Sequence, residues 1–293
     1  MRAMTVQRFD WFRLAPLAFV LLWSGGFTAI RVTLEGTPPF TLLAVRYVAC
    51  VLLVAPVALL RRARLPRGRA LRHVVANALI VQVAYFALTT LALELGASTA
   101  ATALIIALQP VLVALLAPRL AGERVDRLSW AGLGLGLAGA AIVIAARGSI
   151  AGGAAGLAAA FGALLAMTAG VLYEKRFGQA QDPVGTTLVQ YLVGSAACLP
   201  LAFALEDVGI TWSWRFAAGM AYLVAVNSLV SITLLLAMVR RGAAARVSAV
   251  FFLVPPAAAL IAWATIGERP APAAWLGMAL AAAGVALVSR GRR

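Results

Sequence analysis

Ten apolar segments, each close to the length that crosses a bilayer, dominate this sequence. A transmembrane helix needs about 20 consecutive apolar residues to span about 30 Å of hydrocarbon. Segments of about ten residues that alternate apolar and polar side chains, as in an outer-membrane barrel, do not occur. The sequence therefore predicts an all-α integral membrane protein with ten transmembrane helices. These are expected at residues 14–33, 41–60, 71–92, 98–118, 128–146, 154–173, 184–205, 216–238, 246–266 and 272–289.

The composition excludes an ordinary soluble domain. Charged residues make up 12% of the chain and apolar residues 63%, with a mean hydropathy of +0.96, whereas a soluble domain is about 25% charged. The formal charge of +15 would suit a nucleic-acid-binding protein, but the basic residues form short clusters between apolar segments. Membrane lipid, and not nucleic acid, is the expected partner.

Basic residues are divided unequally between the two sets of alternating loops. Twenty lie at the two termini and in or beside the loops that follow the even-numbered segments. Only four lie in the other loops, namely Arg31, Arg147, Arg215 and Arg269. Because cytoplasmic loops of membrane proteins carry an excess of Lys and Arg, both termini are predicted to be cytoplasmic.

The second half of the sequence repeats features of the first. A Gly-Glu pair ends an apolar segment at Gly122-Glu123, and another does so 145 residues later at Gly267-Glu268. The prolines Pro110 and Pro256, inside those two segments, are separated by 146 residues. A period close to half of the 293 residues indicates that one unit was built twice.

Each copy holds five segments, and because five is odd the second copy enters the membrane from the opposite face. The predicted fold is therefore an inverted repeat, with copies at 1–149 and 150–293 in a single membrane domain. Secondary transporters with this plan bind substrate near the midplane between the copies and expose it to each side in turn. One chain already encloses such a pathway, so a monomer is expected.

Several motifs carry a resemblance to a known family. They are the duplicated Gly-Glu pair, the glycine-rich segment after each pair, Trp23-Ser24-Gly25-Gly26-Phe27 in the first segment, and Arg46-Tyr47 in the second. Their order and duplication resemble the EamA-type branch of the drug/metabolite transporter superfamily, over nearly the whole chain. Within it, the aromatic-amino-acid exporter subgroup is the most similar by overall sequence, and not by a motif. The resemblance implies export of small metabolites, often amino acids, across the inner membrane of a bacterium.

Arg46 is the clearest ionisable residue inside a predicted helix. Such residues are functional candidates because burying a charge costs at least ~2.5–3.5 kcal/mol. The planar guanidinium suits a substrate carboxylate. Alternatively, Arg46 pairs with helix-end carbonyls or with Glu35 and extends outward to the interface. The corresponding residue in the second copy is the uncharged Gln190, so both interpretations stay open.

Polar and aromatic side chains at mid-membrane depth complete the predicted substrate site. In lipid, polar groups need hydrogen-bond partners, which a cavity supplies through water or substrate. Hydrogen bonds between helices are the alternative for the polar residues, and core packing is the alternative for the tryptophans. The candidates are Trp23, Ser24, Asn77, Gln82, Tyr85, Gln109, Thr168, Asn227, Ser228, Ser231 and Trp263.

Prolines and glycines inside the predicted helices are candidates for hinges. A proline removes an intrahelical hydrogen bond and kinks its helix, and such a kink either moves during transport or is static. Glycines allow either flexing or close helix approach. The hinge candidates are Gly25, Gly26, Pro110, Gly170, Pro255 and Pro256, whereas Gly132, Gly136, Gly139, Gly277 and Gly284 are expected to be packing faces.

Groups for catalysis or for holding a metal do not converge in the sequence. The lone histidine, His73, lies beside a basic loop, and both cysteines, Cys50 and Cys198, lie inside apolar segments. No metal, cofactor or enzymatic activity is therefore expected.

Acidic residues are missing from the middle of every predicted helix. Proton-driven pumps use such carboxylates as relays, so facilitated transport or weakly coupled exchange of neutral or zwitterionic solutes is predicted. Export of other neutral metabolites or drugs is an alternative function. A lipid-handling or receptor-like protein without transport is an alternative of a different class.

Overall fold

The computed structural model describes residues 14–146, 153–178, 181–242, 244–266 and 269–290. Every regular element in these ranges is a helix. Ten helices, continuous or interrupted, are long and apolar enough to cross a membrane, which confirms the predicted all-α fold. They span Ala15–Leu34, Pro39–Leu60, Gly68–Glu94, Ala101–Leu120, Arg127–Ala145, Ala154–Phe177, Pro183–Leu205, Trp214–Arg241, Ala244–Ile261 and Pro272–Arg290.

Half of the spans are continuous α-helices. Those that begin with proline carry it at the first helical position, where its missing N–H would have had no intrahelical partner. The continuous helices are α3 (Pro39–Leu60), α8 (Arg127–Ala145), α9 (Ala154–Phe177), α10 (Pro183–Leu205) and α15 (Pro272–Arg290).

The third and eighth spans each contain a π-helix in the middle. A π-helix forms i→i+5 hydrogen bonds and is frequent at functional sites. The third span consists of α4 (Gly68–Ala78), η2 (Leu79–Tyr85) and α5 (Phe86–Glu94). The eighth consists of α11 (Trp214–Ala221), η3 (Tyr222–Ser231) and α12 (Ile232–Arg241). Sequence reasoning did not predict these interruptions.

The first, fourth and ninth spans are interrupted at or next to hinge candidates. Gly25 separates α1 from α2 in the first span. Pro110 and Pro255 lie within the first turn of the helix that follows the break in their spans. A proline has no N–H to donate to the preceding turn, so the helix is interrupted there. Kinks are therefore present, whereas their movement stays a prediction. The elements are α1 (Ala15–Ser24) and α2 (Gly26–Leu34), α6 (Thr99–Ile106) and α7 (Gln109–Leu120), and α13 (Ala244–Ala249), the 3₁₀-helix η4 (Val250–Leu253) and α14 (Val254–Ile266).

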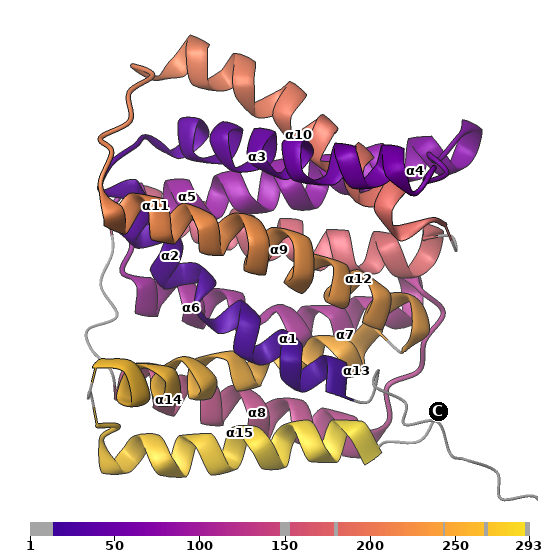
Figure 1. The fold of residues 1–293 in the computed structure, drawn as a ribbon. Coiled ribbons are helices and arrows are strands. Elements are labelled where there is room, and N and C mark those ends of the chain that lie inside the picture. The colour runs from indigo at the N-terminus through magenta and orange to yellow at the C-terminus, as the bar shows by residue number, and fades with distance from the viewer. Residues whose placement is uncertain (1–13, 147–152, 179–180, 243, 267–268, 291–293) are drawn as a thin grey trace, which may run out of the picture.

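The helices lie side by side in one bundle (Figure 1). Helix α8 packs along α15 at one edge, and α3 packs along α10 at the opposite edge. Each pair joins spans that occupy the same place in the two halves of the sequence, the fifth with the tenth and the second with the seventh.

Glycines set the close approach of α8 and α15. A Cβ atom added to Gly132 would lie 2.7 Å from the carbonyl oxygen of Gly284, and one added to Gly277 would lie 2.7 Å from that of Gly139. No side chain fits in that space, so the expectation that these glycines form packing faces is confirmed.

Carboxylates outside the bundle centre cap helix ends. Glu206, directly after α10, accepts hydrogen bonds from the backbone N–H groups of Phe40 and Thr41 at 2.7 and 2.8 Å, and so caps α3.

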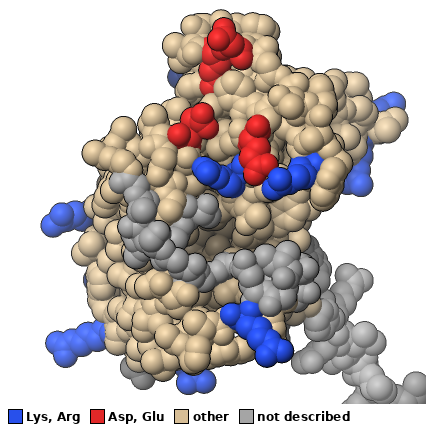
Figure 2. All heavy atoms as spheres, turned by 90° about the vertical axis from the view of Figure 1, so that its left-hand side faces the viewer, with Lys and Arg blue, Asp and Glu red and all other residues tan. Residues whose placement is uncertain are grey.

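The end of the bundle where α15 begins shows only scattered charged side chains on a mostly uncharged surface (Figure 2). There Glu35 forms an exposed ion pair with Arg215, with 3.2 Å between nitrogen and oxygen.

Candidate functional site

Arg46 is completely buried in the middle of the bundle, on α3. Its Nε donates to Ser228 Oγ and its Nη2 donates to Asn227 Oδ1, both at 2.7 Å. The guanidinium carbon lies 4.1 Å from the centre of the Phe86 ring, within the range of a cation–π interaction. Pairing with Glu35, one alternative left open by the sequence, is wrong because Glu35 pairs with Arg215 and Arg46 does not reach the surface.

The Nη1 of Arg46 has no hydrogen-bond partner among the described residues, although it is buried. In the described structure, the hydrogen-bond partners of the guanidinium are the neutral oxygens of Ser228 and Asn227, and no carboxylate is among them. A guanidinium stays protonated in proteins, and a buried charge without an opposite charge is costly. The site therefore holds a positive charge with no opposite charge among the described residues, and both N–H donors of Nη1 are free.

Two π-helices frame this charge. Asn227 and Ser228 belong to η3, whereas Gln82 and Tyr85 belong to η2. Gln82 is 1% exposed, and neither its amide oxygen nor its amide nitrogen has a partner in the described structure. Leaving a buried polar atom unsatisfied costs about 1–3 kcal/mol, so this region offers unused donors and acceptors to a polar ligand.

Aromatic rings line the side of the site next to α1. The Trp23 ring centre lies 6.4 Å from that of Tyr85, 6.3 Å from that of Phe86 and 5.7 Å from that of Phe251. Trp23, Tyr85, Phe86 and Asn227 line one cavity of about 10 Å³, and Trp23 also lines a second of about 20 Å³. Such volumes hold about one water molecule, so the centre of the bundle is closed in this conformation.

The structure brings together six of the predicted substrate-site residues and places the others elsewhere. The six around the centre are Trp23, Arg46, Gln82, Tyr85, Asn227 and Ser228. Ser24, Thr168 and Ser231 are buried but donate to carbonyl oxygens of their own spans, at 2.5, 2.7 and 3.0 Å. Ser24 also reaches Val254 O at 3.2 Å.

Asn77 and Gln109 form separate contacts between helices. Asn77 donates to Glu174 Oε2 at 2.8 Å, and Glu174 also accepts from Arg240. Gln109 donates to Ser248 Oγ at 3.1 Å. These two residues match the alternative interpretation, hydrogen bonding between helices.

Trp263 does not lie with the other candidates. It is 43% exposed near the end of α14, and its ring centre is 5.7 Å from that of Trp275 on α15. The expectation that Trp263 is a deep residue of the cavity is therefore corrected. Its position is typical of a tryptophan at a membrane interface.

The glycine candidates for gating lie at close contacts. A Cβ atom on Gly26 would lie 2.7 Å from Asn227 Nδ2, and one on Gly25 would lie 2.6 Å from the ring of Tyr222. Gly170 approaches the side chain of Val81. Close approach accounts for these residues, and flexing stays a prediction.

Sequence reasoning did not include two tyrosines at the centre, Tyr47 and Tyr191, among the candidate site residues. Tyr47 and Tyr191 are fully buried, and each donates its hydroxyl to a carbonyl of a π-helix, Gln82 O and Ser228 O respectively. Their equivalent positions, 144 residues apart, were a signal that could have identified them.

A family model decides what kind of protein this is. The model of the EamA-like transporter family matches residues 12–145 and again residues 154–290. The chain belongs to the EamA-like transporter family. It is therefore a multi-pass membrane transporter.

Individual relatives of this EamA-like transporter are distant. "Uncharacterized inner membrane transporter YedA" of Escherichia coli K12 is 23% identical over 278 residues, which are 95% of this chain and 90% of the relative. The "Probable terminal-alkyne amino-acid exporter" of Streptantibioticus cattleyicolor is 30% identical over 285 residues, 94% and 93% of the two chains. A solved crystal structure aligns with a TM-score of 0.78 at 22% identity, over 95% of this chain and 97% of the other. That last match shows the fold alone.

Proposed function

We propose that this EamA-like transporter exports amino acids, aromatic or other apolar ones, from the bacterial cytoplasm across the inner membrane. Transport proceeds by alternating access between two inverted repeats, with both termini in the cytoplasm. The 30% identical relative named as an amino-acid exporter supports the class of substrate. The twofold match to the family model supports the repeat.

The observation that carries the proposal is the free Nη1 of the buried Arg46. A carboxylate supplies the two acceptor oxygens and the negative charge that the guanidinium lacks, and the two planar groups match. In the second half the equivalent position holds Gln190, which is uncharged and 4% exposed. One cation suits one carboxylate, as in a zwitterionic amino acid, better than a multiply charged phosphate compound.

The aromatic rings beside Arg46 account for the apolar part of the substrate. Trp23, Tyr85 and Phe86 present ring surface next to the charge, and aromatic surface favours contact with apolar or aromatic groups. The cavities of about 10 and 20 Å³ are too small for an amino acid. We infer that helices separate around the breaks at Gly25, Pro110 and Pro255 to admit it.

Competitive transport into proteoliposomes tests the proposal. The purified protein is reconstituted, and uptake of radiolabelled phenylalanine is measured against a panel of unlabelled amino acids and neutral metabolites. Saturable uptake inhibited best by apolar amino acids is expected. Saturable uptake that only non-amino-acid metabolites or drugs inhibit would favour the alternative substrates, and absence of any saturable flux would favour a lipid-handling or receptor-like role.

A further inference from the structure

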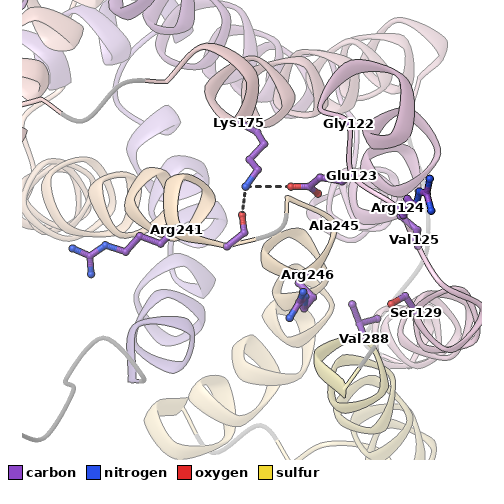
Figure 3. Close-up of a pocket in the computed structure, with 11 residues that line it drawn as sticks. Gly122, Glu123, Arg124, Val125, Ser129, Lys175, Arg241, Ala245, Arg246 and Val288 are labelled. Atoms are coloured by element: carbon purple, nitrogen blue, oxygen red, sulfur yellow. Dashed lines mark hydrogen bonds and ion pairs between the residues drawn. The ribbon is translucent and has the colours of Figure 1, made fainter. Parts of the chain in front are cut away.

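A larger cavity lies away from the central site, at the end of the bundle where α7 and α9 end (Figure 3). Its volume is about 560 Å³, within the range of about 300–1,000 Å³ that is usual for small-molecule sites. Residues from both halves of the sequence line it, including Glu123, Ser129, Lys175 and Arg246.

Lys175 and Glu123 form a partly buried pair on one wall. Lys175 Nζ lies 3.2 Å from Glu123 Oε1 and donates to Gly242 O at 2.6 Å. The Glu123 carboxylate is also occupied by the backbone N–H of Ala244, which lies 3.0 and 2.8 Å from its two oxygens. An ammonium group has three donors, and Glu123 and Gly242 take two of them, so Lys175 keeps one donor for a further acceptor. Both oxygens of Glu123 already accept from the Ala244 N–H.

Arg246 supplies a second cation to the same cavity. In the view of Figure 3 it lies below the Lys175–Glu123 pair, with Ser129 to its right, whereas Arg124 and Arg241 are directed away from the centre. Arg246 is half-buried, and it has neither a hydrogen bond nor an ion pair with any residue that the structure describes. Two cations, Lys175 and Arg246, therefore line the same cavity as one carboxylate, Glu123, that is already bonded to the backbone.

The excess of basic residues in cytoplasmic loops does not by itself explain this arrangement. Most arginines of the loop after the second span, Arg61, Arg62 and Arg64 among them, are exposed to solvent. Lys175 and Arg246 instead line a cavity between helices of both halves, and both are only partly exposed. Charges held at low exposure around a cavity are stronger than surface charges because water screens them less.

We propose that this cavity binds an anionic oxygen group, a carboxylate or a phosphate, between Lys175 and Arg246. The group belongs either to a small solute or to the headgroup of an anionic lipid, and its oxygens accept from the free Lys175 donor and from the Arg246 guanidinium. This site is separate from Arg46, and its occupation is measured without transport, so its test is independent of the proposed function.

Lys175 is the only lysine in the sequence, which makes amine modification a direct probe of the cavity. Purified full-length protein in neutral detergent is treated with an acetylating reagent, and the rate at Lys175 is followed by peptide mass spectrometry. The reaction is repeated with sodium phosphate, with sodium acetate and with sodium chloride at equal ionic strength. In parallel, it is run in nanodiscs of phosphatidylcholine with and without phosphatidylglycerol. The α-amino group of the chain serves as the internal control.

Protection of Lys175 by roughly tenfold relative to chloride is expected at saturating ligand, the scale of one charge-assisted hydrogen bond. Protection by phosphate or acetate in detergent identifies a small-anion site, and protection only with phosphatidylglycerol identifies a lipid headgroup. Arg246→Gln should abolish protection, Arg246→Lys should retain part of it, and the exposed Arg61→Gln should leave it unchanged. Equal rates in chloride and in every anion or lipid, or undiminished protection in a monodisperse Arg246→Gln protein, would overturn the proposal.

Discussion

The ring centres of Tyr47 and Tyr191 lie 5.8 Å apart in the middle of the bundle. Each hydroxyl donates to a carbonyl oxygen of the π-helix in its own half of the sequence. The same contact is thus made twice, by residues 144 positions apart, next to Arg46. This pair ties α3 and α10 to the two interrupted spans that frame the charge.

Removing either hydroxyl should destabilise the protein by a similar amount. Tyr47→Phe and Tyr191→Phe each leave a buried carbonyl without its donor, at a cost of about 1–3 kcal/mol. Thermal unfolding in detergent measures the effect, with Tyr173→Phe, whose hydroxyl bonds to the partly exposed His73, as a milder control. A large effect of one tyrosine and none of the other would contradict an equivalent role.

Glycine at position 132 is expected to be indispensable, whereas glycine at 134 on the same helix is not. An added Cβ at Gly132 meets the Gly284 carbonyl, but one at Gly134 meets nothing within 4 Å. Gly132→Ala should cost about 1–3 kcal/mol through overpacking, while Gly134→Ala should be neutral or stabilise by up to about 1 kcal/mol. Melting temperatures of the two variants check this, and equal values would refute tight α8–α15 packing.

The Glu206 cap predicts a local effect on α3. Glu206→Ala removes the acceptors of Phe40 and Thr41 and should cost about 0.5–2 kcal/mol, as for other N-terminal caps. Hydrogen exchange should show faster opening of the first turn of α3. The neighbouring Asp207→Ala is the matched control, and the same exchange rates in both variants would argue against the cap.

A pH gradient should change amino-acid flux by less than about twofold, because the hydrogen-bond partners of Arg46 among the described residues include no titratable carboxylate. Glu174, the buried acid near the end of α9, is engaged by Asn77 and Arg240. Flux in proteoliposomes with and without an imposed gradient measures the coupling. Obligatory acceleration by protons would contradict the expectation, and loss of that acceleration in Glu174→Gln would identify the relay.

The lengths of the apolar segments predicted the spans well, because a segment's length and hydropathy can be read from residues that are adjacent in the sequence. The third span was expected at 71–92 and lies at Gly68–Glu94. The apolar surroundings of Arg46 placed it inside a helix, but they left open whether its side chain is buried or extends outward to the interface. The partners of Arg46 could not be predicted from the sequence, since Asn227 is 181 residues away and only the fold brings the two together.

The sequence also did not predict the π-helices or the position of Trp263. A π-helix differs from an α-helix in its backbone hydrogen bonds, i→i+5 in place of i→i+4, and the pattern of apolar residues does not reveal this difference. The depth of Trp263 was judged from position within an apolar run, but α14 turns this side chain outward to Trp275. Gly267-Glu268, one half of the motif pair that revealed the repeat, lies outside the described residues.

Recognition of a carboxylate by Arg46 is the central claim, and inhibition of phenylalanine uptake by phenylalanine and by phenylalaninamide tests it most directly. The two inhibitors differ only in the group that would face Nη1. Wild-type protein should prefer phenylalanine by about tenfold or more, since a hydrogen bond to a charged group contributes about 1.5–3 kcal/mol. In Arg46→Gln that preference should disappear, whatever the amount of folded protein. Equal inhibition by both compounds in the wild type, or an unchanged preference in Arg46→Gln, would contradict the account.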